Sequence, residues 1–267
     1  MRELVMLGTG NAMVTKYYNT CFAIIDNGQI FLVDAGGGNT ILRRMEEAGL
    51  AFANVHHMFV THGHTDHVLG VIWVIRKIAT LMGKNKYEGN FYIYGHSEVL
   101  HIIKEIAELT LKKKDLQKMG ERIIFRTVQD KEQLPILTMQ VTFFDILSTK
   151  KKQFGFSAVF PDHYKLSCLG DEPYNEHCRD IVSHSDLLMS EAFCLYADRD
   201  KFNPYEKNHS TVKEACTVAE ELQAQAVLLY HTEDKTFPQR KEKYMAEAKE
   251  FFKKTIYIPD DLEKISF

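Results

Sequence analysis

Three histidines and one aspartate fall within six residues, in the segment Thr61-His62-Gly63-His64-Thr65-Asp66-His67. This segment directly follows the apolar run 58–60, which has the composition of a buried strand. Imidazole and carboxylate are ligands that suit zinc, manganese or iron, and the cluster contains no thiolate for a closed structural zinc site. A surface loop that is merely rich in histidine is the alternative, but so dense a ligand set at a strand end disfavours it. The segment therefore predicts a metal site.

The spacing within this segment predicts two pairs of ligands. Alternation along an extended chain puts His62 and His64 on the same side. A helix that begins at Thr65 places Asp66 and His67 one turn further on. Two neighbouring pairs of ligands can serve two neighbouring metal ions.

Short apolar runs rich in Val, Ile, Phe and Tyr predict two groups of strands. The first group covers residues 4–7, 21–25, 30–33, 58–60 and 91–94, and the second covers residues 123–125, 137–146, 156–160, 164–169, 187–189 and 227–230. Helical patterns end at Gly49 and Gly83, another begins with Ser97 as cap, and a charged amphipathic pattern covers 240–253. Thr211 and Glu214 have the spacing of a capping box. Two strand groups separated and followed by helices predict two sheets packed face to face with helices outside.

Length and composition indicate an ordinary folded protein. A chain of 267 residues with 45% apolar content can bury a substantial core, and we expect one domain over residues 1–267. The formal charge of −3 does not indicate a nucleic-acid or a membrane partner. Five scattered cysteines without a C-x-x-C pair suit reduced thiols, and no leader or long apolar span is evident, so a cytoplasmic location is expected.

The segment H-x-H-x-D-H after a strand resembles the signature of the metallo-β-lactamase superfamily, and other stretches resemble its tRNase Z-like branch. The matching stretches follow one another in the order of that branch: 6–10, 31–38, Gly170-Asp171, Ser190-Glu191-Ala192, His209-Ser210-Thr211 and His231 after an apolar strand. Each match is weak by itself, but the ordered set is specific and spans most of the chain. The resemblance implies an α/β (α+β) chain with the four-layered αββα sandwich of the metallo-β-lactamase fold.

The resemblance also implies a ligand set for two divalent ions, with zinc expected and manganese or iron as alternatives. His62 and His64 would bind the first ion, Asp66, His67 and His231 the second, and Asp171 would bridge them. A water held between two such ions is acidified to hydroxide at neutral pH. Asp66 would also orient this nucleophile or accept its proton.

Three more residues take supporting roles by the same resemblance. Asp34 would hold a ligand histidine in the correct tautomer. His209 would donate a proton to the leaving group or contact an oxyanion. Glu191 would bond to the backbone or to His209.

The chain departs from the pattern of this branch at one ligand. A histidine of the first metal site is expected six residues before the pair Gly155-Phe156, and the residue there is Thr149. A hydroxyl replaces imidazole poorly at zinc, so the first site is expected to be weak or empty unless His163 or Asp145 substitutes. The adjacent lysines are candidate contacts for a phosphate or another anion: Lys150, Lys151 and Lys152.

A metal-dependent hydrolase that uses a metal-bound hydroxide on a phosphodiester is the leading functional prediction. Carboxylic-ester, thioester, lactone and β-lactam hydrolysis use the same hydroxide and are alternatives within the fold. A catalytically degenerate ligand-binding protein is the alternative from another class, and an oxygen-reducing di-iron protein is disfavoured. A small or nucleotide-type anionic substrate is expected, with no membrane partner and a homodimer as an option. A tRNA substrate is less favoured, because Asp171 follows Phe156 by only fifteen positions where a long tRNA-binding arm is usual.

Overall fold

The computed structural model describes residues 2–267, which divide into two compact units. The first unit combines residues 2–8, 18–128 and 261–267, and the second combines residues 9–17 and 129–260. Each unit contains one seven-stranded sheet. The single domain predicted over residues 1–267 is not tested by this division and stays a prediction.

The sheet of the first unit has the strand order β14-β1-β2-β3-β4-β5-β6. Its strands are β1 (Arg2–Gly8), β2 (Cys21–Asp26), β3 (Gln29–Val33), β4 (Val55–Phe59), β5 (Phe91–Gly95), β6 (Ile123–Thr127) and β14 (Lys264–Ser266). The strands from β14 to β3 pair antiparallel, whereas β3, β4, β5 and β6 pair parallel. Asn27 and Gly28 close the β2–β3 hairpin with positive φ, as a two-residue type I′ turn requires.

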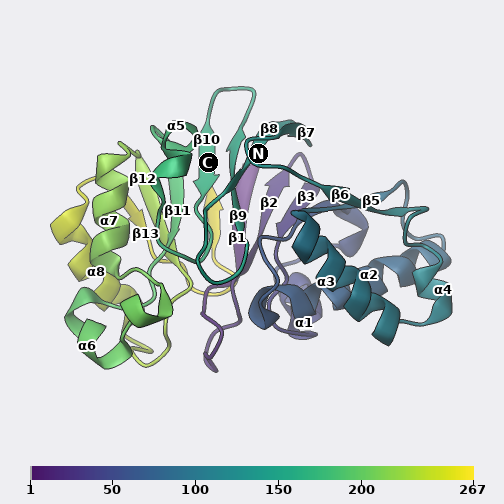
Figure 1. Ribbon diagram of the computed structural model, residues 1–267, viewed down its shortest axis with the longest axis horizontal. Helices are drawn as coiled ribbons and strands as arrows, with labels where there is room; N and C mark the ends of the chain where they lie inside the picture. Colours follow the sequence, from purple (N-terminus) through teal and green to yellow (C-terminus); the bar gives the residue numbers. More distant parts are fainter. Residues whose placement is uncertain (1) are drawn as a thin grey trace. The chain divides into compact units, whose positions relative to one another are not determined.

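Helices of the first unit lie along its sheet (Figure 1) and supply half of its core. They are α1 (Thr40–Glu47), η1 (Phe52–Asn54), α2 (Thr65–Gly83), α3 (Ser97–Thr110) and α4 (Lys113–Leu116). One set of alternate strand residues packs with the apolar faces of α1, α2 and α3: Val5, Leu7, Ala23, Leu32 and Met58 against Ile41, Val71, Ile75 and Ile103. The predicted start of α2 at Thr65 is confirmed. The predicted cap of α3 is wrong, because His96 rather than Ser97 is its N-cap and accepts a hydrogen bond from the Val99 amide.

A glycine lets α2 approach the loop after β3. A Cβ atom at Gly70 would lie 1.8 Å from the carbonyl oxygen of Ala35, so only glycine fits there. The amide of Gly70 donates to the carbonyl of Gly36 at 2.8 Å, and the amide of Ala35 donates to the carbonyl of His67 at 3.3 Å. This close contact fixes the first turn of α2, which carries Asp66 and His67, against the end of β3.

The sheet of the second unit has the strand order β13-β12-β11-β10-β9-β8-β7. Its strands are β7 (Gln133–Ile136), β8 (Met139–Asp145), β9 (Phe154–Val159), β10 (Lys165–Cys168), β11 (Leu187–Glu191), β12 (Ala226–Tyr230) and β13 (Thr255–Tyr257). The strands β10 to β13 pair parallel, and β7 to β10 pair antiparallel. The carboxyl ends of β10, β11 and β12 therefore meet at one edge of this sheet.

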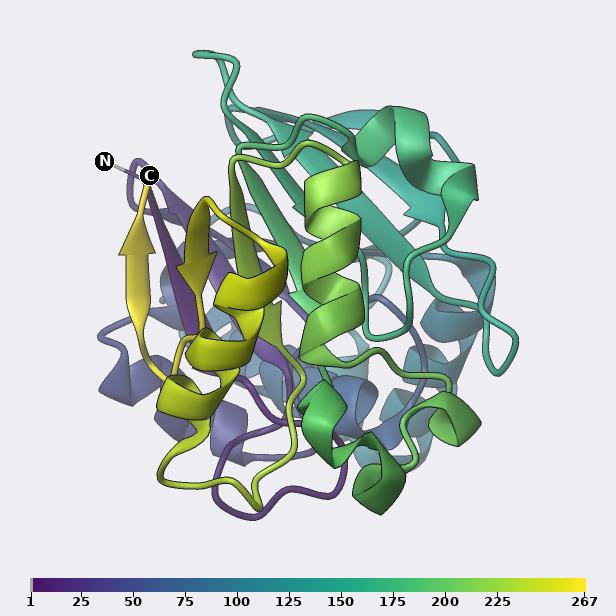
Figure 2. The same ribbon diagram turned by 90° about the vertical axis from the view of Figure 1, so that its left-hand side faces the viewer.

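Figure 2 shows α7 (Val212–Glu221) and α8 (Arg240–Phe251) side by side over the strands of the second sheet. They pack against strand residues such as Leu188, Val227 and Leu229. The remaining helices are short: η2 (Glu176–Cys178), α5 (Arg179–Val182), η3 (Tyr196–Asp198), α6 (Arg199–Phe202) and η4 (Tyr205–Lys207). The predicted capping box of Thr211 and Glu214 is confirmed at the start of α7.

Two strand predictions are wrong, and the edge strands β13 and β14 are not predicted. The prediction places residues 123–125 in the second strand group, but β6 pairs with β5 in the first sheet. The run 137–146 is no single strand, because Leu137 adopts a left-handed φ of 53° and turns the chain between β7 and β8. The edge strands β13 and β14 are only three residues long and lack a strong apolar pattern.

All five cysteines are buried and free of disulfides, as expected for reduced thiols. Within residues 2–267, no helix has the length and apolar character needed to cross a membrane.

Candidate metal centre

Asp34 is the organising carboxylate of the first unit. It follows β3 with a left-handed φ of 53°, a strained conformation that aims its side chain at the end of β4. Its Oδ1 accepts a hydrogen bond from the Thr61 amide at 2.9 Å. Its Oδ2 accepts from the Thr61 hydroxyl at 2.8 Å and lies 2.8 Å from Nδ1 of His67. Both carboxylate oxygens are therefore used to fix the chain on either side of the His62 to His67 segment.

The contact with Asp34 sets the tautomer of His67. A carboxylate accepts the Nδ1 proton, so Nε2 presents a lone pair. This Nε2 lies 3.4 Å from Oδ2 of Asp66, and the His67 side chain is only 1% exposed. Two electron-rich atoms facing each other in a buried place are stabilised by a cation between them, so this donor pair fits a divalent metal.

His62 and His64 bring two more nitrogens together. Nε2 of His62 lies 2.8 Å from Nδ1 of His64, with the two rings 4.5 Å apart and nearly perpendicular. The other ring nitrogen of His62 lies 3.0 Å from the Thr61 hydroxyl, which is itself bonded to Asp34. At this distance one of the two ring nitrogens donates a hydrogen bond to the other, and the pair is close enough for both rings to serve one ion.

In the second unit, Asp171 and His231 lie close together at the carboxyl ends of β10 and β12. Oδ2 of Asp171 and Nε2 of His231 are 3.6 Å apart, and both residues are buried. The turn before Asp171 needs glycine, because Gly170 has a φ of 89°. The hydroxyl of Tyr230, directly before His231, donates to the carbonyl oxygen of Gly170 and so joins the two strand ends. Both side chains belong to groups of His and Asp residues that could hold a metal ion.

Glu191 and His209 form a second buried pair in this unit. Glu191 ends β11 with its side chain fully buried, and its Oε1 accepts a hydrogen bond from the Ser210 amide. Its Oε2 lies 3.6 Å from Nδ1 of His209, whose ring stacks on Phe193 at 4.9 Å. Burial raises the pKa of Glu191. Burial alone would lower the pKa of His209, but the neighbouring Glu191 raises it overall, so His209 can hold a proton for donation.

The structure places Thr149 at an exposed position in the loop between β8 and β9. His163 lies in the turn between β9 and β10, at the opposite end of these strands from Asp171. Because β9 is six residues long, about 20 Å of strand separate its two ends, and His163 cannot replace the missing ligand. Oδ1 of Asp145 accepts a hydrogen bond from the Leu147 amide at 2.8 Å, and its Oδ2 lies 3.6 Å from Nζ of Lys152. Both oxygens therefore contact residues of the loop that contains Thr149.

The lysines of this loop are also held by the second unit. Nζ of Lys150 donates to the carbonyl oxygen of Lys207, and Nζ of Lys152 lies over the ring of Phe154 at 5.5 Å. Lys151 is partly buried. Their predicted contact with an anionic substrate stays a prediction.

The sequence patterns missed two polar residues beside Asp171. Gln153 is 1% exposed and donates from Nε2 to Oδ1 of Asp171. Glu172 accepts hydrogen bonds from the Ser148 hydroxyl at 2.8 Å and from the Asn208 amide at 2.6 Å, which ties the Thr149 loop to the loop before His209. A single glutamine or glutamate in a loop has no spacing that would reveal such a role.

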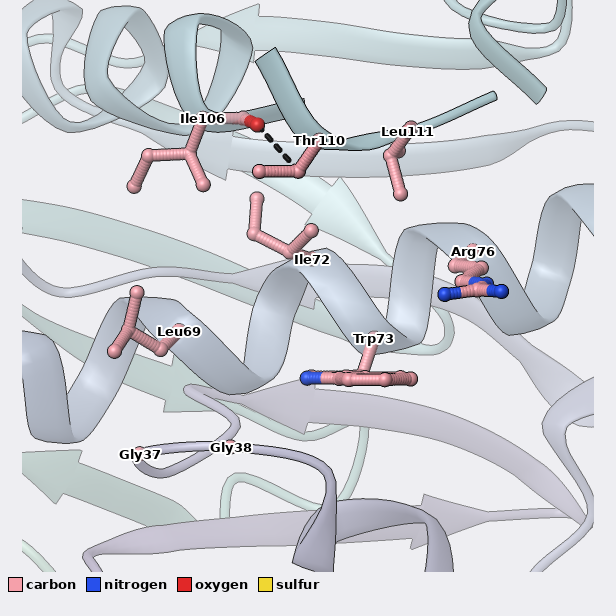
Figure 3. Close-up of a pocket in the computed structure, with 9 residues that line it drawn as sticks. All are labelled: Gly37, Gly38, Leu69, Ile72, Trp73, Arg76, Ile106, Thr110 and Leu111. Carbon is pink, nitrogen blue, oxygen red and sulfur yellow. Dashed lines mark hydrogen bonds between the residues drawn. The ribbon is translucent and has the colours of Figure 1, made fainter. Parts of the chain in front are cut away.

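A hollow of about 280 Å³ lies elsewhere in the first unit, between α2 and α3 and beside the Gly37-Gly38 turn (Figure 3). Its walls are mainly apolar, and Arg76 is the one charged residue among them, 5.4 Å from the ring of Trp73. The described residues that line the hollow include no histidine and no carboxylate. The candidate metal-binding and proton-transfer groups are those of the clusters described above.

Solved structures match the chain over nearly its whole length. The metallo-β-lactamase fold protein YhfI from Bacillus subtilis has a TM-score of 0.79 at 19% identity, covering 99% of this chain and 98% of that one. The short form of human tRNase Z has a TM-score of 0.76 at 20% identity, covering 99% and 98%. The predicted metallo-β-lactamase fold is confirmed by the two sheets with their helices and by the structural similarity to these two proteins.

Sequence comparison narrows the assignment. A Ribonuclease Z from Thermococcus sibiricus is 26% identical over 307 residues, which cover 99% of this chain and 96% of that protein. This match, over nearly the whole length of both chains, bears out the predicted similarity to the tRNase Z-like branch. The family model described as "Anti-Pycsar protein Apyc1" matches residues 2–256, and the chain belongs to this family.

Proposed function

We propose that the protein is a metal-dependent hydrolase of phosphodiesters. The observation that carries the proposal is His67, a buried imidazole whose Nδ1 is held by Asp34 and whose Nε2 faces the carboxylate of Asp66. This is the arrangement by which proteins orient a histidine for a metal. The similarity to a Ribonuclease Z over nearly all of both chains favours a phosphodiester over the carboxylic-ester, thioester and lactone alternatives.

The proposed ligand set is that of the superfamily. His62 and His64 serve the first ion, Asp66, His67 and His231 serve the second, and Asp171 serves both. Imidazole and carboxylate donors without thiolate favour zinc, with manganese and iron as alternatives. When bound, two such ions acidify a water molecule and polarise the phosphoryl group under attack.

The remaining polar residues handle protons. Asp66 orients the attacking water and accepts its proton. His209 gives a proton to the leaving oxygen, and Glu191, 3.6 Å away, keeps that imidazole charged until it does so. Asp34 keeps His67 in the tautomer that leaves Nε2 for the metal.

The proposed substrate is a nucleic-acid-type or nucleotide-type anion that Lys150, Lys151 and Lys152 attract. We do not favour tRNA, since the chain has only fourteen residues between Phe156 and Asp171 for a recognition arm. A homodimer and a cytoplasmic location complete the proposal. The five buried free thiols support a reducing compartment.

Purified protein loaded with zinc or manganese is expected to hydrolyse bis(p-nitrophenyl) phosphate. Asp66→Ala should lower kcat/KM about 10²–10⁴-fold, because the variant loses a ligand and the proton acceptor. Asp200→Ala is the matched control, because the side chain of Asp200 is 89% exposed and should not matter.

Two results would overturn the proposal. If the metal-loaded protein does not hydrolyse phosphodiesters but cleaves thioesters or lactones, its substrates belong to another class of ester. Protein that binds no metal, and whose unfolding temperature a chelator leaves unchanged, would support a pure ligand-binding role.

A further inference from the structure

Gln153 occupies an unusual place for a glutamine. It closes the loop that contains Thr149, because its carbonyl oxygen accepts a hydrogen bond from the Ile146 amide at 3.1 Å. Its side chain is 1% exposed and reaches Asp171, which is 18 residues further along the chain. A glutamine is seldom so completely buried unless its carboxamide has a task.

Half of that carboxamide has no hydrogen bond. Nε2 donates to Oδ1 of Asp171, but Oε1 is buried and has no hydrogen-bond partner within residues 2–267. An unsatisfied buried amide oxygen destabilises the folded protein, because it has lost its hydrogen bond to water. Such an atom is retained where a ligand, an ion or an ordered water satisfies it, and Oε1 keeps its lone pairs for this purpose while Nε2 stays bonded to Asp171.

The surroundings leave space for this group. A Cβ atom at Gly170 would lie 2.8 Å from Nε2 and 3.3 Å from Cδ of Gln153. Glycine at position 170 therefore serves the carboxamide as well as the left-handed turn that precedes Asp171. Asp171 itself faces His231 with Oδ2 and Gln153 with Oδ1.

We propose that Gln153 supplies the donor that the histidine missing at Thr149 would have given, with its Oε1 as a ligand of the first metal ion beside Oδ1 of Asp171. The inference rests on the proposed function, since it concerns one position of the same metal centre. Thr149 is exposed and serves no metal, and the replacement comes from the other end of the same loop.

The change of donor alters the metal preference of the first site. An amide oxygen is a harder ligand than imidazole, and oxygen ligands suit manganese and magnesium better than zinc. The first site should therefore prefer Zn²⁺ over Mn²⁺ less strongly than the second site, which has His67 and His231.

The test counts metal ions, so it does not depend on catalysis. Metal-free protein is titrated with Mn²⁺ and with Zn²⁺ by calorimetry, and bound metal is measured by elemental analysis after gel filtration. Wild-type protein should bind about two ions per chain, and Gln153→Leu about one, with the dissociation constant of the weaker site raised about 10–100-fold. Thr149→Ala is the matched control from the same loop and should bind metal as the wild type does.

Two further variants guard against a folding defect in Gln153→Leu. Gln153→Glu keeps the shape and an oxygen donor, and should retain both ions. Gln153→His introduces imidazole and should increase the affinity of the first site for Zn²⁺ about tenfold relative to Mn²⁺.

The inference is wrong if Gln153→Leu, folded by circular dichroism, binds two ions with wild-type affinity, or if the wild type binds only one. If a phosphodiesterase activity that depends on Asp66 is measured in either case, the proposed hydrolysis of phosphodiesters stands, and a wild type with one ion would correct only the number of ions. Loss of activity on every phosphodiester, with two ions still dependent on Gln153, would reject the substrate class and leave the role of Gln153 intact.

Discussion

The supporting carboxylates of the two units are held very differently. Asp34 in the first unit uses both oxygens, which contact the Thr61 amide, the Thr61 hydroxyl and Nδ1 of His67. Glu191 in the second unit bonds the Ser210 amide through Oε1, while its Oε2 stays 3.6 Å from His209. The first carboxylate therefore has both oxygens in hydrogen bonds or close contacts with its neighbours, whereas the second has one oxygen in a hydrogen bond and the other 3.6 Å from an imidazole.

The proposed ligands differ between the units in the same way. Those of the first unit lie within six residues and depend on one local network around Asp34. Asp171 and His231 are sixty residues apart and meet because β10 and β12 run parallel within one sheet. Residues held by one local network, as around Asp34, should keep a rigid geometry. Where the sheet holds the residues in place, the loss of stability caused by one mutation should be shared among many contacts.

The largest expected effect is that of Asp34→Ala. It leaves two donors on Thr61 and one on His67 without their acceptor in a buried place, so the free energy of unfolding should fall by about 3–5 kcal/mol. Metal affinity should fall about 10–100-fold, since the tautomer of His67 is no longer fixed. Urea unfolding of the metal-free protein and calorimetry measure the two effects.

Asp34→Asn is the control for this variant, because asparagine tolerates the left-handed backbone of position 34 and keeps one acceptor. Its loss of stability should be clearly smaller than that of Asp34→Ala. Equal losses would mean that backbone or packing, rather than the acceptors, makes Asp34 important.

A smaller effect is expected for Tyr230→Phe in the second unit. The substitution removes the hydroxyl that donates to the Gly170 carbonyl and also contacts Sγ of Cys168 at 3.4 Å. One unsatisfied buried carbonyl costs about 1–2 kcal/mol in the free energy of unfolding. Tyr205→Phe, at a half-exposed tyrosine, should change it by less than about 0.5 kcal/mol. A loss for Tyr230→Phe as large as that of Asp34→Ala would abolish the contrast between the units.

The smallest expected effect is a change of stability at acidic pH, and it concerns Asp234. The carboxylate of Asp234 accepts hydrogen bonds from the amides of Thr15 and Lys16 at 2.7 and 3.1 Å. Burial opposes its ionisation, but these amides outweigh burial and lower its pKa. A carboxyl whose folded pKa is depressed adds stability above its unfolded value of about 3.9, and this stability is lost as pH falls through the folded pKa.

Asp234→Asn should therefore show a flatter decline of the unfolding temperature than the wild type between about pH 4.5 and pH 3. Thermal unfolding monitored by circular dichroism over this range provides the measurement. Parallel curves for the two proteins would show that Asp234 contributes nothing to acid sensitivity.

The sequence predicts best what is local. The ligand segment and the start of α2 at Thr65 are visible because adjacent residues carry the whole signal. The sheet assignment of β6 was wrong because an apolar run does not indicate its neighbour. The turn at Leu137 was missed because a bulky residue with positive φ has no sequence signal.

The same limit applies to the candidate site. The contacts of Gln153 with Asp171 and of Tyr230 with Gly170 join residues that are 18 and 60 positions apart. Neither contact follows from periodicity or composition. The absence of a histidine at Thr149 is readable in the chain, but the side chain that could replace it emerges only when β8, β9 and β10 are paired.

The buried cysteines make this protein convenient for site-directed labelling. Burial raises the pKa of Cys178 to about 11 and the pKa of Cys194 and Cys216 to about 12, so these thiols should be unreactive toward maleimides at neutral pH. Met13 in the second unit and Leu109 in the first are 87% and 83% exposed. The double variant Met13→Cys, Leu109→Cys would carry one spin label on each unit without removal of a natural cysteine. The line shape of each label would then report the local mobility of the segment that carries it.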